Sequence, residues 1–155
     1  MTPKKKIFTE NQFKLEVIPL LKEGLTVPLT VSGGSMEPFL AGRRDTVHIS
    51  SPSFPMKKGD IAFFERANGK IVMHRIYKTD GNNYYFVGDA QTEIEGPIPE
   101  PAIFGSVKAV TRKNKKTDSG FVWWFFEKVW IRMVPLRPIC FRLYRATVGK
   151  LKSKA

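Results

Sequence analysis

Two segments of this sequence carry side chains that suit nucleophilic catalysis. The first is residues 31–40, which read Val-Ser-Gly-Gly-Ser-Met-Glu-Pro-Phe-Leu and place Ser35 directly after two glycines. Glycine has no Cβ, so a substrate backbone can approach such a serine closely. A serine hydroxyl becomes a nucleophile when a neighbouring base takes its proton. Ser35 is therefore a candidate nucleophile, and the alternative is a serine that only shapes a turn.

The second segment is residues 69–76, Gly-Lys-Ile-Val-Met-His-Arg-Ile, which contains His74. Imidazole titrates near neutral pH without help, so His74 suits the role of general base. The alternative is a strand histidine with a hydrogen-bonded partner. His48, the other histidine, has no motif around it, and we interpret it as structural or exposed. His74 lies 39 residues after Ser35, so the fold must bring the two together.

Five short motifs follow one another in a fixed order along the chain. They are Ser-Met-Glu-Pro (35–38), Lys-Gly-Asp-Ile (58–61), Val-Met-His-Arg (72–75), Gly-Asp (88–89) and Gly-Ser-Val (105–107). This series resembles the type I signal peptidases, which share a clan with the self-cleaving repressor domains. The resemblance covers roughly residues 25 to 110, and the order of the motifs is more specific than any one of them.

The resemblance implies that Ser35 attacks the scissile carbonyl and that His74 takes its proton and returns it to the leaving amine. Most bacterial members have a lysine base on this strand, whereas His74 resembles the Ser-His branch of the family. A lysine must lose about three pKa units through burial, while histidine starts near 6.5. The substitution therefore reduces the need for a dry site.

The resemblance also implies an oxyanion donor and a carboxylate that orients the imidazole. The Ser35 backbone N–H is the expected donor, since Gly33 stands where some relatives have a serine, and Ser32 is a weaker candidate. In the Ser-His branch the carboxylate follows the Gly-Asp pair. Glu95 occupies the matching position, with Glu93 and Asp89 as rivals.

The elements around these motifs are mostly short β-strands. A helix is expected over 11–23 with Thr9 as its N-cap, and strands over 26–31, 46–50, 61–66, 70–78, 84–87 and 103–111. Asn68-Gly69 predicts a hairpin turn, residues 93–101 a loop and residues 112–120 a linker. The expected fold is mainly β, of the coiled-sheet kind found in signal and repressor peptidases, with an N-terminal helix and a C-terminal helical appendage.

Charge divides the chain into two parts. Residues 1–107 carry 13 basic and 12 acidic side chains, and residues 108–155 carry 13 basic and 2 acidic. We therefore expect a catalytic domain over 1–111 and a basic, aromatic-rich tail over 112–155. A cationic tail favours polyanionic partners such as anionic lipid, nucleic acid or an acidic protein.

The tail is predicted to form two helices, over 121–134 and 139–154, separated by Pro135 and Pro138. In one interpretation it packs on the body. In the other it lies at a membrane interface, with Trp123, Trp124 and Trp130 at headgroup level, and the charge favours this second interpretation. An anionic membrane surface is thus a predicted partner through residues 121–155.

Composition narrows the remaining classes. One cysteine rules out an internal disulfide framework, no metal or cofactor is expected, and no Walker or dinucleotide motif occurs. Neither a secretory signal nor a membrane-spanning helix is expected, which places the chain in the cytoplasm or at the periphery of its membrane. The expected substrate is a peptide or protein with a leader-like segment. The rival is a non-catalytic basic module for nucleic acid or an acidic partner, although no helix-turn-helix or zinc finger supports it.

Overall fold

The computed structural model of this chain describes residues 8–152, and it begins with a short helical segment. Thr9 caps this segment: its side chain accepts from Gln12 N, and the Gln12 side chain accepts from Thr9 N. The predicted N-terminal helix and its cap are confirmed. Its three parts are α1 (Glu10–Gln12), the π-helical η1 (Phe13–Val17) and α2 (Ile18–Lys22).

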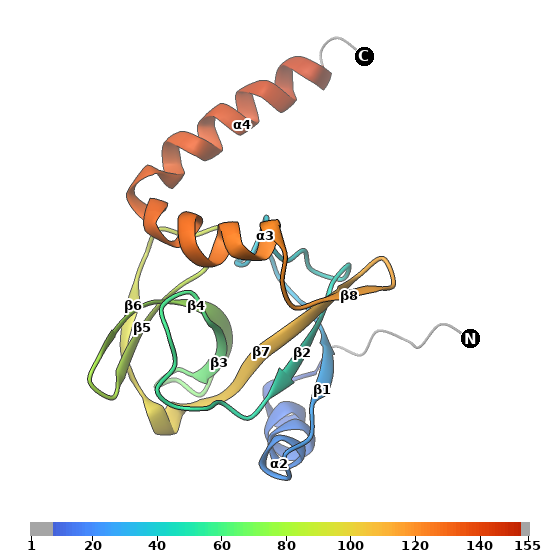
Figure 1. The fold of residues 1–155 in the computed structure, drawn as a ribbon, viewed down its shortest axis with the longest axis vertical. Coiled ribbons are helices and arrows are strands. Elements are labelled where there is room, and N and C mark those ends of the chain that lie inside the picture. The colour runs from blue at the N-terminus through green and yellow to red at the C-terminus, as the bar shows by residue number, and fades with distance from the viewer. Residues whose placement is uncertain (1–7, 153–155) are drawn as a thin grey trace.

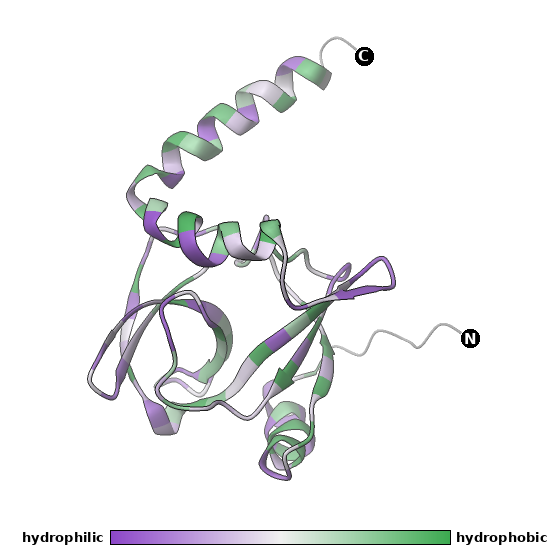
Figure 2. Cartoon of the chain, viewed as in Figure 1, coloured by the Kyte–Doolittle hydropathy of each residue, from purple (hydrophilic) through white to green (hydrophobic). Residues whose placement is uncertain are grey.

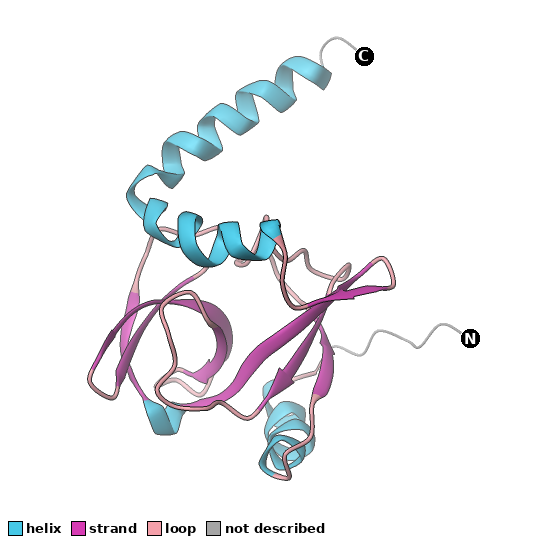
Figure 3. Cartoon of the chain, in the orientation of Figure 1, coloured by secondary structure: helices cyan, strands magenta, loops and turns pink. Residues whose placement is uncertain are grey.

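Eight antiparallel strands form one strongly coiled sheet (Figures 1 and 3). The order across the sheet is β1-β2-β7-β3-β4-β5-β6, and β8 pairs with the far end of β7. The mainly β architecture expected from the sequence is confirmed at this level. The strands are β1 (Val27–Thr30), β2 (Thr46–Ser50), β3 (Ile61–Glu65), β4 (Ile71–Asp80), β5 (Asn83–Val87), β6 (Glu95–Pro99), β7 (Ile103–Arg112) and β8 (Lys115–Thr117).

The hairpin predicted at Asn68-Gly69 joins β3 to β4. Gly69 has a φ of 82°, and Arg66 N donates to Lys70 O across the turn. Two expectations were wrong. The predicted loop over 93–101 contains β6, whose prolines are tolerated because β6 lies at the edge of the sheet. The predicted linker over 112–120 contains β8, which turns back onto β7 through Lys113 and Asn114, both at positive φ.

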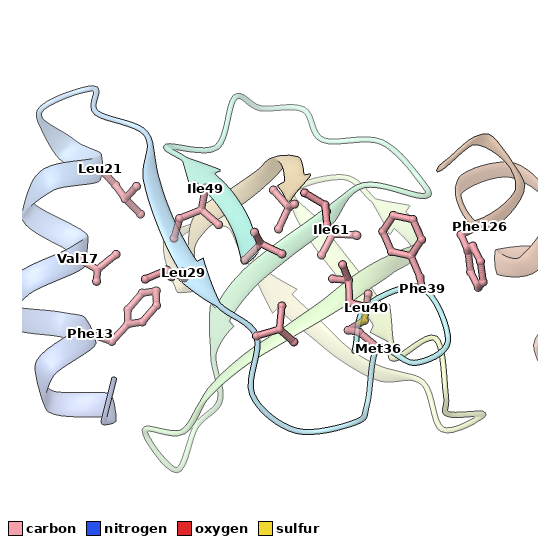
Figure 4. Packing of buried hydrophobic residues seen from close by; sticks show 14 of the residues in the cluster. Phe13, Val17, Leu21, Leu29, Met36, Phe39, Leu40, Ile49, Ile61 and Phe126 are labelled. Carbon is pink, nitrogen blue, oxygen red and sulfur yellow. The ribbon is translucent and has the colours of Figure 1, made fainter. Parts of the chain in front are cut away.

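The largest apolar core lies between the N-terminal helix, the sheet and the loop after β1. Phe13, Val17 and Leu21 face the sheet from the helix, and each is less than a tenth exposed (Figure 4). On the other side of the same core, Met36 and Phe39 are buried directly after Ser35. The serine is thus attached to a well-anchored part of the loop.

The C-terminal appendage divides into a docked part and a projecting part. The docked part packs on the body through Phe126, Trp130, Ile131 and Val134, all buried. It comprises α3 (Phe121–Trp124), the π-helical η3 (Phe125–Val129) and the 3-10 helix η4 (Trp130–Leu136). Helix α4 (Arg137–Lys152) then leads away from the sheet, as Figure 1 shows.

This arrangement corrects the expectations for the tail. Residues 121–134 form three successive helical pieces, and Pro135 lies inside η4 next to Met133, whose backbone is not helical. The second helix begins at Arg137 and not at residue 139. Trp130 is 8% exposed and belongs to the core, so its predicted place among lipid headgroups is wrong, whereas Trp124 is half exposed. Across residues 8–152 we find no helix with the length and apolarity needed to cross a bilayer.

Candidate functional site

The loop that carries Ser35 leaves β1 and returns to β2. Val31 N donates to Asp45 O and Arg43 N donates to Val31 O, so its two ends are held side by side. Residues 32–34 are exposed, Ser35 is half-buried, and Met36 is buried. The apolar side chains after the serine thus anchor the loop, while its glycine-rich start stays open to solvent.

His74 lies on β4, where it is paired with Ala62 of β3, and it is only 2% exposed. Its Nδ1 lies 2.9 Å from Glu95 Oε1. Because a carboxylate accepts, Nδ1 carries the proton and Nε2 is left as the acceptor of the neutral ring. Glu95 begins β6, which explains how a residue 21 positions later in the chain reaches the ring.

Arg66 fixes Glu95 in turn. Its Nε donates to Glu95 Oε2 at 2.7 Å and its Nη2 donates to Oε1 at 2.9 Å, a two-pronged geometry that sets the plane of the carboxylate. Arg66, Glu95 and His74 therefore form a row of charge-assisted hydrogen bonds that ends at the imidazole.

The environment keeps His74 neutral at neutral pH. Burial lowers the pKa of His74, and the nearby carboxylate of Glu95 opposes this only in part. Burial would raise the pKa of Glu95, but the hydrogen bond from Arg66 and the interaction with His74 outweigh it and lower that pKa overall. A neutral imidazole beside an ionised carboxylate is the state that a general base requires.

Ser35 and His74 line the same cavity, which has a volume of about 400 Å³. Its walls come from the N-terminal helix, the loop after β1 and strands β3 and β4, with apolar contributions from Phe13, Val31 and Met73. Neither Ser35 Oγ nor His74 Nε2 has a hydrogen-bond partner among the residues that the structure describes. Within residues 8–152, therefore, no hydrogen bond joins Ser35 Oγ to His74 Nε2, and catalytic hydrogen bonds are often long before substrate binds.

Asp89 and Glu93, the other two candidate carboxylates, do not bond to His74. Asp89 is fully buried and accepts from Arg75 Nε at 2.9 Å and Nη2 at 2.8 Å. Arg75 also donates to Gly59 O, which ties β4 to the turn before β3. Asp89 therefore holds the strand next to His74, and Glu95 is the carboxylate in contact with the ring.

The loop after β5 is in direct contact with the loop that carries Ser35. Ala90 N donates to Ser35 O at 2.9 Å. A Cβ added to Gly88 would lie 2.5 Å from Ser35 O and 2.7 Å from Gln91 Oε1, so glycine is required for this close approach. The position of Ser35 thus depends on the loop 88–91.

The docked part of the appendage and the first residue of α4 bond to the same loop 88–91. Trp130 Nε1 donates to Asp89 O at 2.8 Å, and Arg137 Nη1 donates to Gly88 O at 2.8 Å and to Gln91 O at 2.7 Å. Arg137 is fully buried with its guanidinium over the Trp130 ring. The region expected to be a separate tail therefore supports the backbone that contacts Ser35.

These contacts give a prediction for Gly88→Ala. The added methyl group should push the loop 88–91 away from Ser35 and lower the rate of peptide cleavage by about 100-fold, because misplacement of reacting groups by about 1 Å has effects of this size. Steady-state cleavage of an internally quenched peptide measures it. Gly149→Ala in α4, where a Cβ meets no atom within 4 Å, is the control and should leave the rate unchanged. Equal rates for both variants would contradict the assigned role of the loop.

Three contributors to this site carry no motif in the sequence. Arg66 precedes a hairpin turn, where a charged residue is ordinarily solvated, and Trp130 and Arg137 lie in a segment that resembles an interfacial tail. Arg66 directly follows β3, and nothing in the local sequence links it to Glu95, 29 residues later. His48, interpreted as structural, bonds to Thr111 Oγ1 at 2.8 Å and does not line the cavity.

Comparison with protein-family models and with curated protein sequences yields no match for this chain.

Proposed function

We propose that this chain is a serine endopeptidase, similar to the Ser-His branch of the type I signal peptidases, that cleaves a leader or signal-like segment from a peptide or protein. The observation that supports it is the joint lining of one cavity by Ser35 and a buried His74 whose Nδ1 rests on Glu95. The order of the five sequence motifs adds independent support.

In this proposal Ser35 Oγ attacks the scissile carbonyl carbon while its proton passes to His74 Nε2. Glu95 stabilises the imidazolium that forms, and the Ser35 N–H donates to the oxyanion. The proton on Nε2 then goes to the leaving amine, the C–N bond breaks, and an ester to Ser35 remains. Water, deprotonated by the same nitrogen, hydrolyses that ester and restores the hydroxyl.

The cavity walls suit an extended peptide whose side chains are small or medium-sized and apolar. Strand β4 supplies Ile71 and Met73, and the loop after β1 supplies Val31, so apolar groups from two elements line the cavity together with Ser35 and His74. By the family resemblance, the residues next to the cut are small. This preference belongs to the proposal and is examined with peptides that carry Ala or Leu at the position before the cut.

The acid limb of the pH–rate profile tests the base directly. Activity requires neutral His74, so kcat/KM should fall as pH drops through the pKa of His74, which burial holds below 6.5. Glu95→Gln removes a negative neighbour, so the limb should move to lower pH. Arg66→Gln removes a positive neighbour, so the limb should move to higher pH.

We expect the acid limbs of these two variants to shift in opposite directions. The measurement is kcat/KM on one quenched peptide from about pH 4 to about pH 8, a range that spans the ordinary histidine pKa near 6.5. Glu95→Gln should also lower kcat by about 10- to 1,000-fold, since the carboxylate orients the ring. Identical acid limbs in wild type and both variants would contradict His74 as the base. The rival, a non-catalytic basic module, predicts no cleavage at any pH.

A further inference from the structure

Helix α4 exposes large apolar side chains along its projecting length. Its first turn packs on the body, with Phe141 against the Trp130 ring at 5.8 Å, but beyond it Leu143 is 63% exposed, Tyr144 68% and Leu151 67%. Figure 2 shows hydrophobic and hydrophilic residues alternating along this helix as it leaves the sheet. With Ile139, which is 55% exposed, the helix has four exposed large apolar side chains, and such a surface points to an interaction site.

Exposed apolar side chains of α4 lie opposite two of its arginines, whereas Lys150 falls at the edge of the apolar side. At 3.6 residues per turn, Leu143, Tyr144 and Leu151 fall within an arc of about 100°. Arg142 and Arg145, both exposed, are centred on the opposite side of the helix. No acidic residue occurs from position 128 to the end of the sequence. The helix is therefore amphipathic with a charge of one sign.

We propose that α4 docks on an anionic lipid surface, with the leucines and the tyrosine inserted at the headgroup boundary and the arginines among the lipid phosphates. Helices of this composition lie in the plane of the interface, and each basic residue near an anionic surface adds about 1 kcal/mol. The expected membrane contact covered residues 121–155, and the proposal concerns the projecting part of α4 within it. In the docked part Phe126, Trp130, Ile131 and Val134 are buried against the body, while Phe121, Val122 and Trp124 at its start are exposed.

Charge argues against the other occupants. A second copy of α4 would bring like charges together, since the helix carries no carboxylate to pair with its arginines. A nucleic acid would contact the arginines but would leave Leu143, Tyr144 and Leu151 in water. A lipid surface satisfies both faces at once.

The base of α4 also joins the helix to the candidate site. Arg137, its first residue, is fixed in the loop 88–91, and Pro138 and Phe141 line a groove together with Arg66, Gln91 and Glu95. A docked helix would hold this groove beside the lipid surface. A peptide tethered to the membrane would then reach Ser35 and His74. This last step rests on the proposed function, whereas the docking of α4 on lipid does not.

The test uses the full chain and vesicle co-sedimentation, with no cleavage reaction involved. Vesicles of phosphatidylcholine alone are compared with an equal mixture of phosphatidylcholine and phosphatidylglycerol. We expect binding to the mixture that weakens as NaCl rises. Leu143→Ser/Leu151→Ser should reduce the partition coefficient by at least 10-fold. Arg142→Gln/Arg145→Gln should reduce it by about 30-fold, on the anionic vesicles only.

Lys115→Gln/Lys116→Gln in β8 is the matched control, since it removes the same charge from an exposed site away from α4. Thermal unfolding of each variant verifies that it is folded. Equal loss of binding in the control and the arginine variant would overturn the proposal in favour of non-specific charge attraction. Absence of vesicle binding, or tighter binding to a DNA duplex than to the anionic vesicles at the same salt, would overturn it as well.

Discussion

Replacing Ser35 with alanine should lower kcat for an internally quenched peptide by about 10⁴- to 10⁶-fold, because the attacking oxygen is lost. His74→Ala should cost nearly as much, since the hydroxyl is unreactive without its base. The double variant should be no slower than the worse single variant, because two residues that act as one unit are not additive.

Ser53→Ala supplies the control for this comparison. Ser53 is an exposed serine between β2 and β3 and does not line the cavity, so its loss should leave kcat unchanged. Far-UV circular dichroism on the wild type and all four variants distinguishes loss of the nucleophile from loss of the fold. Cleavage at the wild-type rate by a folded Ser35→Ala variant would contradict the proposed mechanism.

Asp89→Ala should lower the free energy of unfolding by about 3–5 kcal/mol, the largest stability effect that we expect from one substitution. It removes both carboxylate acceptors of Arg75, which is 1% exposed and lies over the Phe39 ring. The buried guanidinium keeps its bond to Gly59 O but loses its counter-charge. Urea denaturation followed by tryptophan fluorescence measures the change.

Two further variants calibrate that result. Glu65→Gln breaks the ion pair between Glu65 and Lys14, two side chains that are each more than a third exposed. The free energy of unfolding should fall by less than about 1 kcal/mol. Arg75→Met/Asp89→Leu removes both buried charges and should be less destabilised than the sum of the two single changes. Similar losses for Asp89→Ala and Glu65→Gln would show that the Arg75–Asp89 pair is not buried as described.

Local signals were sufficient for the elements near the site. The cap at Thr9, the turn at Asn68-Gly69 and the strand over 70–78 that contains His74 each depend on neighbouring residues, so a sequence reveals them directly. Ser35 and His74 were selected by motif order, and the structure places them at one cavity, although their catalytic roles stay predictions.

Long-range partners were beyond local patterns. Trp130 looks like an interfacial aromatic until its Nε1 is seen to bond to Asp89 O, 41 residues earlier. Arg66 becomes relevant only when β6 pairs with β5 and brings Glu95 within reach. Strand β6 was not predicted, because its prolines indicated a loop. Proline is compatible with a strand chiefly at a sheet edge, and the edge position is not visible in the sequence. Tertiary packing, and not propensity, decided each of these cases.

Covalent labelling with a peptidyl diphenyl phosphonate tests the activated serine most directly. Attack by Ser35 Oγ on phosphorus would release phenoxide and leave a stable adduct that peptide mass spectrometry assigns to one residue. We expect a single adduct on Ser35, no labelling of Ser35→Ala, and strongly slowed labelling of His74→Ala. Labelling of Ser35→Ala at the wild-type rate, or an adduct at another side chain, would contradict the proposal that His74 makes Ser35 a nucleophile.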